Sequence, residues 1–371
     1  MTKTRLDIHE KMLLALLKAS LNVHIPDLVW FEAAKPEDWK ECAQLAKRQG
    51  VLALAWDGVC RLPENLQPYT DLKISWALAV EKYEKKYAHY CETVNELSTF
   101  YREHGISMVQ LKGVGLSTYY PVPSHREGGD IDIYTYSSDT DILSHEEANR
   151  LADCLMLEND IDVERDRPKH THFRFHDITI ENHTTFLDVE RSPVSAKVEV
   201  LLSKILSPRQ VELIGGHNIM IPSDDFNVLF VAFHAIQHYG CGLSLHHLCD
   251  WACLIKRFGL TLQNVIDDSH LMKGIVTMTS LCNEYLGTDV KVDADHRLMN
   301  EMLYEIFNPF DESAMPETGA LDRLVFKCKR FEHKVRTRNR FIYTPLWRNK
   351  EFWEKVKKSI KWHFNKILDL I

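Results

Sequence analysis

Hydrophobic residues recur every three to four positions along the first hundred residues of the chain, which is the period of amphipathic helices. The longest such stretch runs from Asp71 to Glu103 without a proline or a glycine, so it predicts one long helix. Another helix is predicted to begin at Pro36, because proline and the two acidic residues after it suit a first helical turn. Residues 1–104 are therefore predicted to form an N-terminal helical region.

The spacing between hydrophobic residues shortens beyond Gly105. A mostly apolar run that ends at Lys112 predicts a buried strand, and a later run alternates apolar and polar residues with period two. Two further runs predict a strand pair with a tight turn at Asp177, and a helix is predicted between these runs and the earlier strands. The predicted strands cover residues 106–111, 130–136, 172–176 and 178–183, and the predicted helix covers residues 146–158. Residues 105–220 are predicted to form an α/β core.

The helical period returns after about residue 220. Ser223 is a suitable N-cap for a helix over residues 226–239, two glycines would end that helix, and the next helix is predicted over residues 245–258. Residues 221–371 are therefore predicted to form a C-terminal helical region. The expected fold class is α+β: a small mixed β-sheet flanked by N- and C-terminal helical regions.

The composition is that of an ordinary globular protein. The 371 residues include 45 Lys and Arg against 53 Asp and Glu, a net charge of −8, and 45% of them are hydrophobic. These values exclude disordered, collagen-like and disulfide-scaffold proteins. No apolar run approaches the ~20 residues that cross a bilayer, and the short apolar run near the start lacks the cleavage site of a signal peptide. Nine cysteines without a Cys-x-x-Cys pair suggest neither a zinc knuckle nor a disulfide framework, so a cytoplasmic location is expected.

The end of the chain is strongly basic. From Arg323 to Lys366 there are 15 Lys and Arg residues against three Glu, and an amphipathic helix is predicted from about Glu351. Such a helix can pack its apolar face on its own domain, lie on an anionic membrane surface or bind nucleic acid. The packed arrangement is the favoured prediction, and an anionic partner of the tail is the alternative.

Two acidic residues stand two positions apart at the start of a predicted strand. Because side chains alternate along a strand, Asp130 and Asp132 are predicted to lie on the same face. Two carboxylates that close together repel each other unless a cation lies between them, and a hard ion such as Mg²⁺ prefers oxygen ligands. An Asp-x-Asp pair alone is also common on exposed strands, so the pair indicates a metal site only together with the residues around it.

Residues suited to phosphate binding surround this acidic pair. Lys112, Gly113 and Gly115 join a strand to a helix, where backbone N–H groups and the helix dipole attract anions. Arg126 can contact a phosphate with two N–H groups, and Gly129 directly precedes the acidic pair. Each feature is weak by itself, but their order along the chain is specific. A phosphate cradle beside metal-binding acids is typical of phosphoryl or nucleotidyl transfer.

Later residues add a third acid and several histidines. Glu181 lies in a predicted strand that can pair beside the strand of Asp132, and His183 follows two positions later on the same face. His183 is therefore predicted to be a neighbour of the active site. His234 and His238 are one helical turn apart and could share a metal ion, but without a His-Glu-x-x-His motif a structural role is favoured.

These motifs together resemble a known family. They are similar to the motifs of the uncharacterised bacterial nucleotidyltransferase family of the polymerase-beta-like superfamily, including its hydrophobic-Glu-x-His strand. The resemblance covers about residues 90 to 260. It rests on residues 111–113, 119–121, 126, 129–133 and 180–183.

The resemblance implies specific roles. Asp130 and Asp132 would bind the catalytic metal ions, Glu181 would be the third carboxylate, and Gly113 would be the glycine of the superfamily's phosphate-binding turn. The chain departs from the pattern at Val114, where the superfamily usually has Ser or Gly.

The expected function is metal-dependent transfer of a nucleoside monophosphate from an NTP to an unknown acceptor, with release of pyrophosphate. The acceptor could be a small molecule, a protein or RNA, and the expected cofactor is Mg²⁺ or Mn²⁺. The expected nucleotide-binding residues are Lys112, Gly113, Gly115, Arg126 and Gly129. The rival hypothesis is a weak or inactive member of the fold that acts as a binding or regulatory protein through its helical flanks, and Val114 favours it. A hydrolase that uses the histidines is a third hypothesis, which tightly bound zinc would favour.

Overall fold

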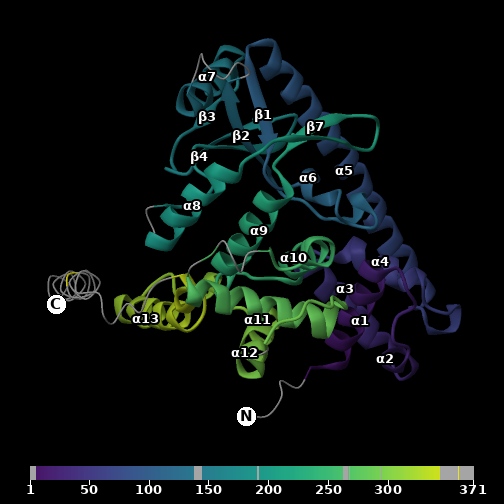
Figure 1. Ribbon diagram of the computed structural model, residues 1–371. Coiled ribbons are helices and arrows are strands. Elements are labelled where there is room, and N and C mark those ends of the chain that lie inside the picture. The colour runs from purple at the N-terminus through teal and green to yellow at the C-terminus, as the bar shows by residue number, and fades with distance from the viewer. Residues whose placement is uncertain are drawn as a thin grey trace.

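The computed structural model describes residues 6–137, 144–189, 192–261, 266, 268–293, 295–342 and 358. The sheet lies at one end of the molecule, and a body of helices lies at the other (Figure 1). The long helix α5 (Thr70–Glu103) extends along both parts, because it packs against α4 (Leu52–Cys60) in the helical body and against β1 (Ile106–Gln110) in the sheet. The α+β fold class is therefore confirmed.

The N-terminal helices begin where their capping residues predict. Asp7 and Glu10 form a capping box at the start of the first helix, and Pro36 is the first residue of the third. The long helix predicted over residues 71–103 is confirmed almost residue for residue. The helices that precede α4 are α1 (Ile8–Asn22), α2 (Val29–Glu32) and α3 (Pro36–Arg48).

The five-stranded sheet is mixed, as predicted, with the strand order β1-β2-β5-β4-β3. The β2–β5 pair is parallel, whereas the other neighbouring strands are antiparallel. The hairpin β4–β5 turns at His176 and Asp177, whose positive φ angles of 48° and 61° suit a two-residue hairpin turn. Helix α7 (His145–Glu158) packs on β2. The remaining strands are β2 (Ile131–Ser137), β3 (Val163–Glu164), β4 (His170–Phe175) and β5 (Ile178–His183).

The segment after the sheet contains elements that the hydrophobic pattern did not predict. Helix α8 (Pro193–Ile205) begins at a proline after the N-cap Ser192. It leads into the two-stranded hairpin of β6 (Arg209–Glu212) and β7 (Asn218–Ile221). Strand β7 packs against β1 and α6 (Val114–Ser117), so this hairpin supports the two elements that flank the turn of Lys112 and Gly113.

Most of the C-terminal helices share one hydrophobic core with the N-terminal helices, whereas α13 (Ala320–Arg336) contributes no buried residue to it. Helix α1 packs against α10 and α11, and the Gln49 side chain bridges the two regions, since it donates to the Ile306 carbonyl and accepts from the Leu245 N–H. The predicted helices over residues 226–239 and 245–258 are confirmed. The C-terminal helices are α9 (Asp224–His238), α10 (Leu245–Phe258), α11 (Ser269–Leu286), α12 (His296–Phe307), α13 (Ala320–Arg336) and α14 (Asn339–Ile342).

The amphipathic helix predicted from Glu351 lies outside the described residues, apart from Lys358, so its packing stays a prediction. Among the helices that the structure does describe, none combines the length and the apolar character needed to cross a membrane.

Candidate active site

The third predicted acid lies directly beside the acidic pair. In the parallel pairing of β2 with β5, Asp132 is the register partner of Glu181. Strand β2 begins at Ile131, so Asp130 precedes the strand and is exposed, whereas Asp132 is only 4% exposed. The two members of the Asp-x-Asp motif therefore have different surroundings.

Asp132 is held by two cationic or hydrogen-bonding neighbours. The Lys112 Nζ lies 2.9 Å from Asp132 Oδ1, and the His183 Nε2 lies 3.0 Å from the same oxygen. Burial alone would raise the pKa of Asp132, but Lys112 and His183 outweigh burial and lower this pKa well below its ordinary value. Asp132 is therefore a carboxylate at neutral pH. Both contacts are to Oδ1, and within the described part of the chain Oδ2 has no hydrogen bond or ion pair.

Glu181 completes a group of polar side chains around His183. The His183 Nε2 lies 3.5 Å from Glu181 Oε2, and the His170 Nδ1 lies 3.4 Å from the same oxygen. Burial raises the pKa of Glu181, but the hydrogen bond from His183 leads among the effects that lower it overall. The side chains of His170, Glu181 and His183 offer ligand atoms that all lie within 4.8 Å of one another. His183 is fully buried, which agrees with its predicted place beside the acidic pair.

Asp130 has the opposite pKa shift. Although the residue as a whole is exposed, its carboxyl group lies in the clefts, where partial loss of hydration and then the negative charges of Asp132 and Glu181 raise the pKa of Asp130. The three acids therefore repel one another, as the sequence predicted for the Asp pair. A bound cation would relieve this repulsion.

The Lys112-Gly113 turn has a backbone conformation that favours glycine. Gly113 has a φ of +57°, and a Cβ at this position would lie 2.5 Å from the Gln110 Nε2. The Gly113 carbonyl accepts a hydrogen bond of 3.0 Å from the Arg126 Nη1. Val114 begins α6 and is buried in the core beneath the sheet. Val114, at which the sequence differs from the motif that it resembles, is therefore a residue of the hydrophobic core.

The Arg126 guanidinium is engaged by protein groups on every nitrogen. Its Nε and Nη2 each lie 2.8 Å from an oxygen of Asp250, and its Nη2 also lies 3.4 Å from the His246 Nε2. The Tyr120 hydroxyl donates to Asp250 at 2.6 Å. Arg126 therefore ties the Gly113 turn to α10, and its predicted contact with phosphate stays a prediction.

The other two glycines of the motif lie in different environments. The Gly115 N–H donates to the Lys112 carbonyl, and a Cβ on Gly115 would lie 2.8 Å from the Ile221 Cγ2. Packing against β7 thus explains this glycine, and its predicted role in nucleotide binding stays a prediction. Gly129 is exposed, and its carbonyl accepts a hydrogen bond from the Tyr90 hydroxyl.

Two adjoining clefts open at this end of the sheet. The smaller, with a volume of about 120 Å³, is lined by the Gly113 turn, both aspartates and residues of α9 and α10. The larger, of about 570 Å³, has the size of a small-molecule site and reaches from Glu181 to α13. Lys112, Asp130 and His234 line both clefts.

Lys169 is a residue of the larger cleft that the sequence did not single out. It directly precedes β4 and is largely buried, and within the described residues its ammonium group has no ion-pair partner. The pKa of Lys169 is lowered, mainly by burial of the ammonium group and secondly by the positive charge of Lys112. Only the fold could identify this lysine, because it lies in no motif. An unpaired cation in a cleft is well placed to bind an anion.

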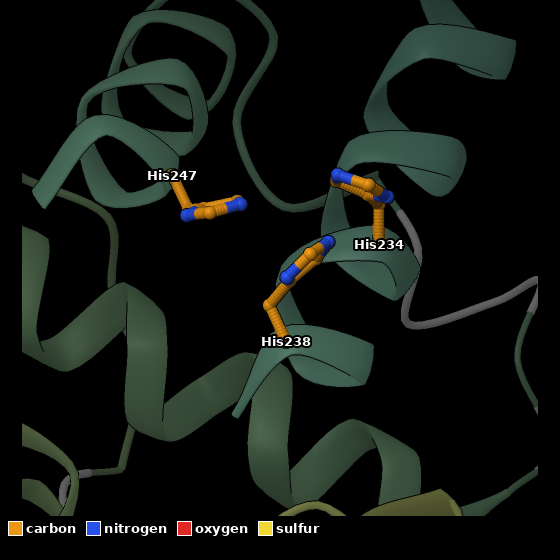
Figure 2. A group of neighbouring side chains, drawn as sticks. All are labelled: His234, His238 and His247. Atoms are coloured by element: carbon orange, nitrogen blue, oxygen red, sulfur yellow. The ribbon is translucent and has the colours of Figure 1, made fainter. Parts of the chain in front are cut away.

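Three histidines lie on the helical side of the clefts. His234 and His238 of α9 and His247 of α10 point toward one another across the space between the two helices (Figure 2). Burial lowers the pKa of all three imidazoles, that of His238 to about 4. They are therefore neutral at pH 7. The sequence placed the first two together, but not the third.

The sequence comparison decides the family. The model of a family described as "uncharacterised nucleotidyltransferase" matches residues 35–287, which is more than half of the chain. The chain belongs to this nucleotidyltransferase family. The matched range begins just before α3 and ends just after α11, so it is broader than the range of about residues 90 to 260 over which the motifs were recognised.

The other comparisons add little to the family assignment. No curated protein matches this nucleotidyltransferase. Among solved structures, it is similar to an antigenic nucleotidyltransferase-like protein from Paracoccidioides brasiliensis, at 13% identity and a TM-score of 0.38. That similarity covers 54% of this chain and 94% of the other.

Family membership also bears on the clefts. A nucleotidyltransferase has a nucleotide substrate, and the matched range includes the Gly113 turn, all three acids and Lys169. The residues brought together at the end of the sheet therefore lie within the part of the chain that defines the family.

Proposed function

We propose that this nucleotidyltransferase transfers a nucleoside monophosphate from an NTP to an acceptor hydroxyl or phosphate at the cleft beside Asp132. The observation that carries the proposal is the pairing of Asp132 with Glu181, with the Lys112 ammonium 2.9 Å from Asp132. The arrangement places carboxylates and an ammonium group, which act on metal ions and phosphates respectively, at one end of the sheet. We also assign the fold to the polymerase-beta-like superfamily on the motif of the two aspartates.

The donor set fits a hard divalent cation such as Mg²⁺ or Mn²⁺. Asp130, Asp132 Oδ2 and Glu181 would hold it, because carboxylate oxygens are the ligands that such ions prefer and the three acids otherwise repel one another. When bound, the metal ion would supply charge stabilisation for the reacting phosphate oxygens. The Lys112 ammonium occupies Asp132 Oδ1 and would keep Asp132 in place.

The residues of the chain have separate tasks in this reaction. An oxygen of the acceptor attacks the α-phosphorus of the NTP, a new P–O bond forms, and the bond from the α-phosphorus to the bridging oxygen of the β-phosphate breaks. Pyrophosphate leaves with the electron pair of that bond. Glu181 would either complete the metal site or accept the proton of an acceptor hydroxyl, and its lowered pKa keeps it ionised for either task. Lys112 and Lys169 would bind the negatively charged triphosphate.

The test is nucleotide transfer by the purified full chain. The protein is incubated with Mg²⁺, each of the four α-labelled NTPs and a set of small-molecule, protein and RNA acceptors, and both the transfer of label to the acceptor and the release of unlabelled pyrophosphate are measured. We expect release with at least one NTP and its loss in Asp132→Asn. Absence of release and of any nucleotide binding at millimolar NTP would contradict the proposal. Equal release by Asp132→Asn would show that the reaction occurs elsewhere.

A further inference from the structure

The histidines between α9 and α10 form a compact group with free ring nitrogens. His234, His238 and His247 each offer a nitrogen, and these nitrogens all lie within 4.8 Å of one another. The ring centroids are 4.5 Å apart for His234 and His238, and 4.6 Å apart for His238 and His247. Within the described part of the chain, no hydrogen bond reaches a ring nitrogen of His234 or His238. The three side chains are partly buried and line the clefts, so an ion can reach these nitrogens.

We propose that His234, His238 and His247 bind a divalent transition-metal ion such as Zn²⁺, with a further coordination position open to the cleft. Imidazole nitrogen is a preferred ligand of zinc, and three protein ligands with one open position are typical of zinc sites that act on a substrate. This site is separate from the carboxylate site of the proposed transfer reaction, whose oxygen ligands suit Mg²⁺.

The local fold holds the three ligands in place. His234 and His238 are one turn apart on α9, so their rings lie on the same side of the helix. The tight connection at Gly240 and Gly242 then reverses the chain and leads to Ser244, the N-cap of α10, which places His247 opposite them (Figure 2).

Ser244 contacts the third ligand. Its backbone N–H donates to the His247 Nδ1 at 3.2 Å, and its hydroxyl lies 2.9 Å from the same nitrogen. While Nδ1 accepts this hydrogen bond, the proton of the neutral ring is on Nε2. Binding of a metal ion through Nε2 therefore requires that proton to move to Nδ1, from which it can be donated to the Ser244 hydroxyl, as in most histidine ligands of metal sites.

The surroundings indicate what the open position would take. His234 and His247 line the smaller cleft, and His234 and His238 line the larger one, so the group is reached from both. Lys169 and Arg338 also line the larger cleft and would repel a bound cation. An anionic fourth ligand, such as a phosphate oxygen, would offset this repulsion, so we expect the open position to bind anions.

The test uses Co²⁺ as a spectroscopic substitute for Zn²⁺. The full chain without a histidine tag is freed of metal by a chelator and titrated with Co²⁺, and the visible absorption of the ion is recorded. We expect one equivalent with the spectrum of a low-coordinate nitrogen site, loss of that spectrum when Zn²⁺ is added, and a changed spectrum when inorganic phosphate is added. No binding of either ion at micromolar concentration would overturn the proposal. A spectrum that phosphate leaves unchanged would contradict the proposed open coordination position.

Variants identify the ligands. His238→Phe keeps an aromatic ring in the packed group and His234→Gln is a smaller polar change, so a folding defect in one leaves the other as a test. Each should weaken Co²⁺ binding by at least about tenfold, the smallest loss expected even for a residue that only supports a ligand. The control is His296→Ala, an exposed histidine at the start of α12, which should bind as the wild type does. Unchanged affinity in both cleft variants would overturn the proposal.

Two further variants separate this site from the acidic one. Glu181→Gln removes the carboxylate of a second histidine-containing group, formed with His170 and His183. Asp132→Asn removes the proposed transfer activity. Both should leave the Co²⁺ spectrum unchanged, so the metal site stands even if the proposed transfer reaction is wrong. Loss of the spectrum in Glu181→Gln but not in His238→Phe would move the ion to the acidic site and overturn the assignment.

Discussion

Arg126 and Asp250 form a buried pair in which two guanidinium nitrogens face two carboxylate oxygens, each at 2.8 Å. They are 124 positions apart in the chain, one in the loop before β2 and the other in α10. Burial alone would raise the pKa of Asp250, but Arg126 and His246 lower it well below its ordinary value. Because Arg126 also donates to the Gly113 carbonyl, this pair joins the turn at the active site to the helical body.

Loss of the Asp250 charge should destabilise the protein strongly. Asp250→Asn leaves the Arg126 guanidinium buried without its anionic partner, and such losses cost about 3–5 kcal/mol. Unfolding in urea should show this decrease in the free energy of unfolding. The double variant Arg126→Met/Asp250→Leu should lose less than the sum of the single variants, because no charge is left unpaired. A cost below about 1 kcal/mol for Asp250→Asn would contradict the buried pair.

Kinetics can separate two roles of Arg126. If Arg126 only positions the Gly113 turn, Arg126→Lys should lower kcat with little change in the KM for NTP. If it contacts the triphosphate, as the sequence suggested, the KM should rise as well. The geometry favours the first outcome, because the guanidinium nitrogens already have protein partners.

The local parts of the fold were predictable from the sequence because their signals are local. The period of 71–103 and the cap at Ser223 fix helices without reference to the rest of the chain. The β6–β7 hairpin was missed because its strands have four residues each, and one of them, β6, has little apolar character. The parallel pairing of β2 with β5 is a different case, because nothing in the sequence of a strand specifies which strand will be its neighbour.

The candidate site shows the same limit. The three acids could be named from the motif, but the contact of Asp132 with Lys112 and His183 depends on the register of two strands and on the turn between β1 and α6. Lys169 and His247 carried no signal at all. Their proximity to the site results from long-range packing, which a pattern of neighbouring residues does not encode.

Gly113→Ala should impair both stability and transfer. The φ of +57° is strained for alanine, and the new Cβ would lie 2.5 Å from the Gln110 Nε2. We expect a cost of about 1–3 kcal/mol in the free energy of unfolding and a large decrease in kcat/KM. Gly128→Ala is the matched control, because a Cβ there meets no atom within 4 Å and its φ is not positive. Similar losses in the two variants would indicate that any methyl group added at the smaller cleft, which both glycines line, is responsible and not the Gly113 conformation.

Mg²⁺ should stabilise the protein through the three acids. Binding to the native state alone adds about 1.4 kcal/mol when free Mg²⁺ is tenfold above its dissociation constant, which thermal unfolding at pH 7 detects as a higher Tm. Asp130→Asn should remove this increase and leave the metal-free protein equally or slightly more stable, since Asp132 and Glu181 raise the pKa of Asp130. Asp177→Asn, in the β4–β5 turn, is the control and should respond to Mg²⁺ as the wild type does. An unchanged response in Asp130→Asn would place the ion elsewhere.

His125 should make stability depend on pH. Its two ring nitrogens each lie 3.0 Å from a carboxylate, of Asp57 and of Glu84. Burial lowers the pKa of His125, but the two carboxylates outweigh burial and raise it overall. The folded pKa thus exceeds the unfolded value of about 6.5, so the stabilisation is complete below that value and is lost as the pH rises through the folded pKa. His125→Asn should therefore lower the Tm more at pH 6 than at pH 9. An equal decrease at both values would show that packing, not charge, explains the loss.

Lys169→Met should separate substrate binding from stability. The ammonium group is largely buried without an ion-pair partner among the described residues, and burial lowers its pKa, so its removal should leave the Tm unchanged or slightly higher. A charge-assisted hydrogen bond to phosphate contributes about 1.5–3 kcal/mol, so kcat/KM for NTP should fall roughly 10- to 100-fold, mainly through KM. Lys169→Arg should retain more of the affinity because it keeps the charge. Lys334→Met is the matched control: Lys334 lines the same cleft but is paired with Glu312, 3.3 Å away, and its loss should change the KM for NTP much less. A normal KM in Lys169→Met would mean that the triphosphate binds on the other side of Lys112, in the smaller cleft.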